Sequence, residues 1–181
     1  MRAHDDDRNE VALDLMEECA AEGDPVACYL AALWHRNGEG AAADPLRCSY
    51  WIRQLVALAE QGNPEAQWEL SGMCRWGDLL PMDINQANHW LALAAEGGFG
   101  EAQHHLAWYL ETGQYNLPMD AEASESWYRR AFEQRHPETL YTFALREFKD
   151  GKITASAIAL LREAADGGLR QAADVLREYT H

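Results

Sequence analysis

The sequence has few of the features that would indicate a membrane, β-rich or disordered chain. Its apolar runs stay well short of the roughly 18 residues that a membrane-spanning helix needs. Alternating runs of valine, isoleucine and threonine, which are typical of strands, are absent. The 6 prolines and 13 glycines are too few to indicate disorder. Alanine, leucine, glutamate and arginine are common instead, so we predict an all-α fold with no membrane partner.

Basic residues are scarce, with 15 lysines and arginines against 30 aspartates and glutamates and a formal net charge of -15. Residues 1–24 supply a large share of the negative charge. A surface of this sign repels phosphate backbones, so we expect no nucleic-acid partner. It would attract a basic protein or peptide, although the same charge can serve solubility alone.

Recognisable catalytic motifs are absent as well. No serine is followed three residues later by lysine, and there is no HExxH, no GxSxG and no phosphate-binding loop. His104 and His105 are neighbours, so they point to different sides of a helix and cannot chelate one metal ion as an i, i+4 pair does. We predict no catalytic, cofactor-binding or metal-binding residues.

The first ten residues, MRAHDDDRNE, are the opposite of a secretory signal. They predict a cytoplasmic location, or a periplasmic one if a leader has been removed. We expect residues 1–9 to form a flexible acidic tail and residues 10–23 to form an N-terminal capping helix.

The stretch from Gly62 to Gly98 predicts one hairpin of two helices. Asn63 can accept hydrogen bonds from the first turn of a helix, and Pro64 suits the first helical position. Gly77 is placed to end that helix. Asp83 can cap a second one, which runs to Gly97-Gly98.

The same pattern recurs along the chain. Asp44, Asp83 and Asp120 lie 39 and 37 residues apart, and each is followed seven residues later by a tryptophan. The tetrapeptide Leu-Pro-Met-Asp occurs at 80–83 and again at 117–120. A period in this range indicates stacked helical hairpins, each of which buries a face that its neighbour completes. The three tryptophans, Trp51, Trp90 and Trp127, are expected in the core between hairpins, whereas Trp68 and Trp108 are expected to be partly exposed.

We therefore predict an α-solenoid of stacked antiparallel helix hairpins, with about ten helices in a right-handed superhelix. Residues 1–181 are predicted to form a single domain, and we expect a monomer. After the capping helix, the repeats are predicted at 24–62, 63–98, 99–135 and 136–168, followed by a C-terminal capping helix at 169–181.

The repeats resemble the Sel-1-like repeat family, a relative of the tetratricopeptide repeats. The resembling frame is A-x3-L-G-x2-Y-x2-G, a loop, and then D-x2-(K)A-x2-W-Y-x2-A-A-x2-G. Its positions are matched by Ala66, Leu70, Gly77, Asp83, Ala87, Trp90, Ala94, Ala95 and Gly98, and again by Ala102, Leu106, Gly113, Asp120, Trp127, Tyr128 and Ala131. Ser71 and Ala107 replace the usual glycine after leucine. The fourth unit lacks the capping aspartate and carries Leu160 at the tryptophan position.

The resemblance implies an adaptor without catalytic activity, which binds a peptide or protein in a concave groove lined by the first helix of each hairpin. It also bears on the four cysteines. Cysteine-rich relatives pair positions near Cys19 and Cys28 in a disulfide, but the absence of a signal peptide favours buried free thiols here, Cys48 and Cys74 included.

Helix phase predicts which first-helix residues face the groove, since residues two positions from the core set point away from it. Tyr29, Trp68, His104 and Tyr141 form an aromatic column in this prediction, either as a binding strip or as packing between neighbouring helices. The partner-binding residues predicted for the concave face are Tyr29, Leu33, Arg36, Trp68, Arg75, His104, Trp108, Glu111, Tyr141 and Phe148.

Three functions remain open from the sequence. The first is a scaffold for a protein or peptide, most simply a basic one. The second is an immunity protein that neutralises a bacterial toxin, a role that some bacterial members of the family have. The third is a small-molecule binder or hydrolase that uses the groove, for which Glu101, His104 and Glu111 are the candidate polar groups on one helix face.

Overall fold

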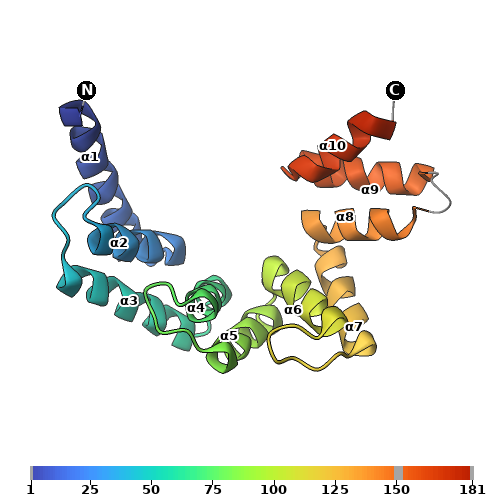
Figure 1. Ribbon diagram of the computed structural model, residues 1–181, viewed down its shortest axis with the longest axis horizontal. Helices are drawn as coiled ribbons and strands as arrows, with labels where there is room; N and C mark the ends of the chain where they lie inside the picture. The colour runs from blue at the N-terminus through green and yellow to red at the C-terminus, as the bar shows by residue number, and fades with distance from the viewer. Residues whose placement is uncertain (1, 149–152, 180–181) are drawn as a thin grey trace. The chain divides into compact units, whose positions relative to one another are not determined.

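The computed structural model describes residues 2–148 and 153–179, and within these ranges the chain forms ten α-helices and no strands (Figure 1). The all-α prediction and the predicted helix number are confirmed. No helix in the described ranges combines the length and apolarity that crossing a membrane requires. The helices are α1 (Arg2–Ala21), α2 (Pro25–Asn37), α3 (Pro45–Glu60), α4 (Pro64–Trp76), α5 (Ile84–Glu96), α6 (Gly100–Thr112), α7 (Ala121–Glu133), α8 (Pro137–Arg146), α9 (Ala155–Asp166) and α10 (Arg170–Tyr179).

Polar side chains begin most of these helices, and four of them, Asp44, Asn63, Asp83 and Asp120, were predicted from the sequence. Each of the capping residues accepts a hydrogen bond from a backbone N–H of the first turn, which satisfies a group that the helix itself leaves without an acceptor. The residues that cap in this way are Asp24, Asp44, Asn63, Asp83, Asp120 and Thr154. His136 precedes α8 but makes no capping hydrogen bond, so Pro137 alone favours the start of that helix.

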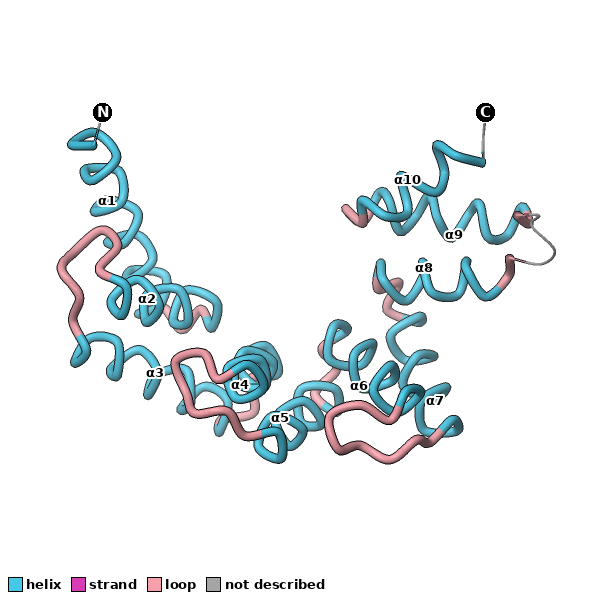
Figure 2. The backbone as a smooth tube through the Cα atoms, in the orientation of Figure 1, coloured by secondary structure: helices cyan, strands magenta, loops and turns pink. Residues whose placement is uncertain are grey.

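The helices pack as successive hairpins, in which loops reverse the chain between antiparallel neighbours (Figure 2). Gly38 and Gly77 end α2 and α4 in the left-handed conformation, with φ of 76° and 69°. A side chain at either position would be strained, which explains why glycine recurs there in the repeat.

The chain forms two compact units, which divide between Phe99 and Gly100. In the first unit α2 pairs with α3 and α4 with α5, and α1 packs on α2. In the second unit α6 pairs with α7 and α8 with α9, and α10 packs on α9. The division falls within a residue or two of the predicted boundary between the second and third repeats. That residues 1–181 form a single domain stays a prediction.

Trp51 confirms the predicted role of the repeated tryptophan, since only 4% of it is exposed. Trp90 and Trp127 are only half-buried, so the prediction that they are core residues is wrong: they lie at the edge of the core. The residue that follows each of them, Leu91 or Tyr128, is 0% or 1% exposed and occupies the core instead. One residue turns a helix by about 100°, so the ring is displaced to the edge of the interface.

Glu17 ties the first helix to the next two. Its Oε1 accepts hydrogen bonds from His35 Nε2 at 2.8 Å, Arg47 Nη1 at 2.5 Å and Trp51 Nε1 at 3.1 Å. Burial alone would raise the pKa of the Glu17 carboxyl, but these hydrogen bonds and the charge of Arg47 outweigh it and leave the pKa below its ordinary value. The carboxylate therefore stabilises the packing of α1, α2 and α3.

The N-terminus differs from the prediction. Helix α1 begins at Arg2, so the expected flexible tail at residues 1–9 is wrong from Arg2 onward. Residues 2–9 contain neither proline nor glycine, and nothing in that composition stops a helix. Helix α8 ends at Arg146, and Glu147 follows it as the C-cap.

Candidate interaction surfaces

In the first unit, the first helices of two hairpins are joined through one aspartate. Helices α2 and α4 contact each other, and Asp78 lies just after α4. Tyr29 Oη of α2 donates to Asp78 Oδ2 at 2.8 Å, and Arg36 Nη1 donates to Asp78 Oδ1 at 2.6 Å. Burial and the hydrogen bond to Asp78 raise the pKa of Tyr29 to about 12. Burial opposes the shift at Asp78, but Tyr29 and Arg36 still lower the pKa of that carboxyl, so it stays ionised.

A hollow of about 210 Å³ lies beside this contact. One of its lining residues is Trp76, the last residue of α4, which is 68% exposed. Burial and the neighbouring charge of Glu65 raise the pKa of the Glu69 carboxyl in its wall. The surface therefore combines aromatic rings with two carboxylates. The hollow is lined by Tyr29, Glu69, Gly72, Met73, Trp76 and Asp78.

Arg75 does not face outward as predicted, since only 4% of it is exposed. Its guanidinium donates to Ser71 Oγ and to Asn88 Oδ1 of α5, each at 3.4 Å. Arg75 follows Ser71 by four residues and shares its helix face, which packs on the second helix of the hairpin. The correct outward position is Trp76, which continues the i, i+4 row of Trp68 and Gly72.

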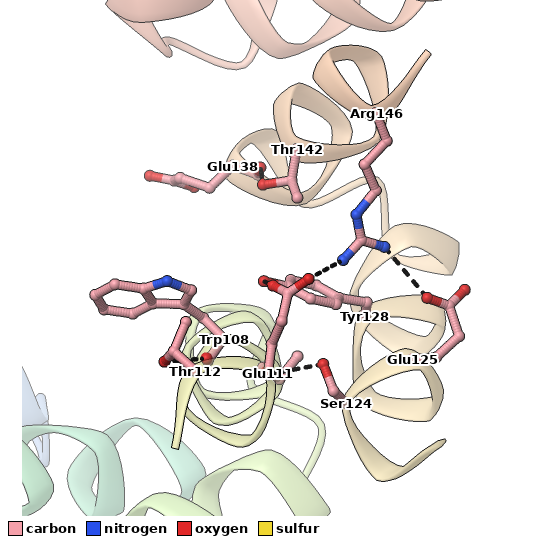
Figure 3. Close-up of polar contacts among 10 residues, drawn as sticks. Trp108, Glu111, Thr112, Ser124, Glu125, Tyr128, Glu138, Thr142 and Arg146 are labelled. Atoms are coloured by element: carbon pink, nitrogen blue, oxygen red, sulfur yellow. Dashed lines mark hydrogen bonds and ion pairs between the residues drawn. The ribbon is translucent and has the colours of Figure 1, made fainter. Parts of the chain in front are cut away.

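In the second unit, Arg146 of α8 joins the two helices of the preceding hairpin (Figure 3). Its Nη2 donates to Glu111 Oε1 of α6 at 3.0 Å, and its Nη1 donates to Glu125 Oε2 of α7 at 3.2 Å. The guanidinium carbon lies 4.7 Å from the centre of the Tyr128 ring, in the range of a cation–π contact. Tyr128 Oη in turn donates to Glu111 Oε2 at 3.0 Å. Glu111 is thus held in place by α7 and α8.

The second unit also presents an exposed aromatic ring on its first helix, α6. Trp108 of α6 is 39% exposed, and Figure 3 shows its ring and the side chain of Glu138 pointing to the same side, away from Tyr128. Thr112 and Thr142 lie near them and bond to backbone carbonyls of their own helices at 2.8 Å. Among the aromatic residues predicted for the site in this unit, Trp108 is the exposed one, whereas His104, Tyr141 and Phe148 are half-buried.

Other predicted site residues are more engaged in packing. His104 is half-buried, and its Nδ1 lies 3.0 Å from Thr139 Oγ1. Burial, together with the nearby charges of His105, His136 and Arg146, lowers the pKa of His104 to about 3, so the ring is neutral at physiological pH. Leu33, Trp68, Tyr141 and Phe148 are half-buried, and the last two pack on the core of α8, α9 and α10.

The three residues considered for catalysis are linked through shared neighbours. Thr139 Oγ1 lies 3.0 Å from His104 Nδ1 and 3.3 Å from His136 Nδ1, and His136 Nε2 lies 3.8 Å from Glu101 Oε1. Tyr128, whose ring centre lies 5.5 Å from that of His104, donates to Glu111, which pairs with Arg146. No group of three histidines, cysteines or acids in the described part of the chain could hold a metal ion. The four cysteines are free thiols; Cys28, Cys48 and Cys74 are buried as expected, whereas Cys19 is exposed.

Sequence reasoning missed Glu69, Trp76 and Asp78. For Trp76 a signal existed, because positions 68, 72 and 76 form one continuous row on the helix. Asp78 lies in a loop, and its partner Tyr29 is 49 residues away, so no local pattern could reveal the contact.

The chain belongs to the Sel1 repeat family. The model of the Sel1 repeat matches residues 25–58, 64–99, 100–136 and 154–169, more than half of the sequence. The last match, residues 154–169, covers only α9 and the residues next to it. This is the unit that lacks the capping aspartate and the tryptophan. The resemblance inferred from the repeat frame is confirmed, and Sel1 repeat proteins are protein-interaction scaffolds.

Several known proteins are similar to this chain in sequence or in structure. Chitin synthase regulatory factor 3 of Schizosaccharomyces pombe is 30% identical over 128 residues, which cover 69% of this chain and 13% of that protein. A Sel1 repeat protein from Oxalobacter formigenes has a TM-score of 0.66 and 25% identity, covering 94% of this chain and 49% of that one. A protective antigen of uropathogenic Escherichia coli has the same fold, with a TM-score of 0.60 and 23% identity, covering 90% of this chain and 35% of that one. The chain thus spans less than half the length of these relatives.

Proposed function

We propose that this chain is a non-catalytic adaptor, and that it binds a basic protein or peptide on the side formed by the first helices of its repeats. The observation that carries the proposal is an exposed tryptophan on a first helix of each unit, which in the first unit shares a hollow with two carboxylates. Trp76 lines that hollow with Glu69 and Asp78, and the second unit exposes Trp108 on α6.

Physical chemistry supports a basic partner for such a surface. Tryptophan at interfaces contributes large apolar area and attracts cations to its face, so it is enriched among binding hot spots. The formal charge of -15 adds a field that attracts positive partners over longer range. The relatives named as chitin synthase regulatory factors are consistent with a regulatory adaptor that acts through another protein.

Truncating the two tryptophans should weaken binding without unfolding the protein. We expect Trp76→Ala and Trp108→Ala each to cost at least about 2 kcal/mol of binding, roughly 30-fold in affinity, because hot-spot rings dominate interface energies. The partner is first captured from a lysate of the cells in which the protein naturally occurs, and it is identified by mass spectrometry. Its affinity for each purified variant is then measured by calorimetry.

Leu46→Ala is the matched control, since Leu46 is 82% exposed but belongs to the second helix α3. It should bind the partner as the wild type does. If Leu46→Ala weakens binding and the two tryptophan variants do not, the partner binds the second-helix side and the proposed surface is wrong.

Salt should act mainly on the rate of association. Long-range attraction between an acidic surface and a basic partner is screened within about 10 Å at 0.1 M salt, whereas short-range contacts are screened less. Raising the salt concentration should therefore slow association several-fold and change dissociation little, as measured by surface plasmon resonance. An association rate that does not change with salt concentration would show that the partner is not recognised by charge.

The two other functions have less support from the described residues. An immunity role differs from the adaptor role only in its partner, and no feature of either surface singles out a toxin. A hydrolase would need polar groups that converge on an open site, but His104 is half-buried and bonded to Thr139, and Glu111 is paired with Arg146.

A further inference from the structure

Gly72 has no structural explanation within the chain itself. It lies in the interior of α4, where glycine is among the least favourable residues. Of the glycines in the described ranges, it alone has neither a positive φ nor an atom within 4 Å of the position that a Cβ would take. Neither backbone conformation nor packing therefore requires glycine there. What its missing side chain does provide is open space, because Gly72 forms part of the lining of the 210 Å³ hollow.

The size of the hollow selects the kind of group that fits. Pockets for drug-sized ligands measure about 300–1,000 Å³, and this one is smaller. It can accept one side chain that enters from a partner, with the backbone of α4 as its floor. The rings of Tyr29 and Trp76 flank the space, and Trp76 is 68% exposed.

The charges around the hollow favour a cation. Asp78 is already paired with Arg36, with 2.6 Å between nitrogen and oxygen. Among the described residues, no cation forms such an ion pair with Glu69. Its burial and the nearby carboxylate of Glu65 make its own negative charge unfavourable, which raises the pKa of Glu69. A positive group placed in the hollow would relieve this cost and would also contact the face of an aromatic ring.

We propose that this hollow receives a single arginine or lysine side chain of the partner, with Gly72 as its floor, the rings of Tyr29 and Trp76 at its sides and Glu69 as its counter-ion. The proposal rests on the proposed function, because it specifies how the first unit recognises a basic segment. It assigns to Gly72 and Glu69 a role that the repeat pattern does not reveal.

The test uses two blocked pentapeptides that differ only in charge, with arginine or its neutral counterpart citrulline between alanines. Each is titrated into the isotope-labelled 181-residue chain and followed by NMR at the Gly72 amide and the Trp76 indole. The arginine peptide should produce saturable shifts with a dissociation constant on the order of 1 mM, as expected of a single anchored side chain. The citrulline peptide should bind at least about tenfold more weakly, because it lacks the charge-assisted bond.

Three variants locate the binding. Glu69→Gln keeps the shape of the side chain and should weaken the arginine peptide about tenfold. Gly72→Leu should fill the hollow and abolish the shifts while the melting temperature stays equal or rises, since leucine is a better helix former. Gln86→Leu adds the same side chain to an exposed position of α5 and should leave binding unchanged.

Equal binding of the two peptides, or no saturable shift with the arginine peptide, would overturn the cation pocket. The proposed function would survive that result if the captured partner still loses affinity through Trp76→Ala and Trp108→Ala. A converse outcome is that the hollow binds the arginine peptide while the affinity of the partner is unchanged by both tryptophan variants. That result would reject the proposed adaptor surface and would show that the hollow binds a cation other than a side chain of that partner.

Discussion

Replacing Trp51 with alanine should lower the free energy of unfolding of the first unit by about 3–5 kcal/mol, the range for large aromatic residues truncated in a core. Trp51 is 4% exposed and belongs to the cluster that contains Leu55 and Leu70. Its loss leaves a ring-sized cavity between α3 and its neighbours. It also removes the indole N–H that donates to Glu17, the residue that ties α1 to the repeats. The measurement is urea denaturation followed by circular dichroism, which does not depend on the fluorescence of the deleted ring.

Trp76→Ala is the matched control for this experiment. It removes the same side chain from a position that is 68% exposed, so it should change stability by less than about 0.5 kcal/mol. Trp90→Ala should fall between the two, because Trp90 is half-buried at the edge of the same cluster. A loss below about 1 kcal/mol for Trp51→Ala would show that the ring is not a core element of the stack.

His104 should make the second unit sensitive to acid. Its pKa is lowered from 6.5 to about 3 in the folded protein, first by burial and then by the charges of His105, His136 and Arg146. Below pH 6.5 the unfolded chain takes up a proton at His104 that the folded protein does not. The contribution of the neutral His104 to the free energy of unfolding is therefore fully present above that pH and is lost as the pH falls toward 3. Between about pH 7.5 and about pH 5 this one group should reduce the free energy of unfolding by about 2 kcal/mol.

The variant His104→Gln isolates this contribution. Its amide can still bond with Thr139 but has no proton to gain, so its stability should fall about 2 kcal/mol less than that of the wild type over the same pH range. His89→Gln, at an exposed position of α5, should behave as the wild type does. Hydrogen exchange of the α6 amides at both pH values would place the effect in the second unit. Parallel pH profiles for His104→Gln and the wild type would contradict the prediction.

The positions of the helix ends were predictable because their causes are local. Asp44, Asp83 and Asp120 act on backbone groups two or three residues away, so their spacing alone predicted where α3, α5 and α7 begin. The same holds for Gly38 and Gly77, whose left-handed conformations end two helices. The repeat then implied hairpins, because an isolated helix with one apolar face must bury it against a neighbour.

The candidate surface was only partly predictable. The row of Trp68 and Gly72 pointed to the correct side of α4, yet it was extended to Arg75 instead of Trp76. Residues 75 and 76 differ by about 100° around the helix, and the neighbouring helix α5 decides which of them is covered. Arg75 is buried against Asn88, and Trp76 remains exposed.

The sequence by itself determined the helices, the hairpin repeat, the family and the acidic charge, because each depends on residue type and short spacing. The tertiary structure alone decided that Leu91 and Tyr128 occupy the core beside Trp90 and Trp127, and that Asp78 joins Tyr29 to Arg36 across 49 and 42 residues of chain. It also decided that Gly72 opens a hollow beside Glu69, a carboxylate that forms no ion pair with any described residue. These features depend on the angle and the distance at which neighbouring helices pack. A repeating sequence pattern does not specify either value, because different side chains can fill the space between helices over a range of angles and distances.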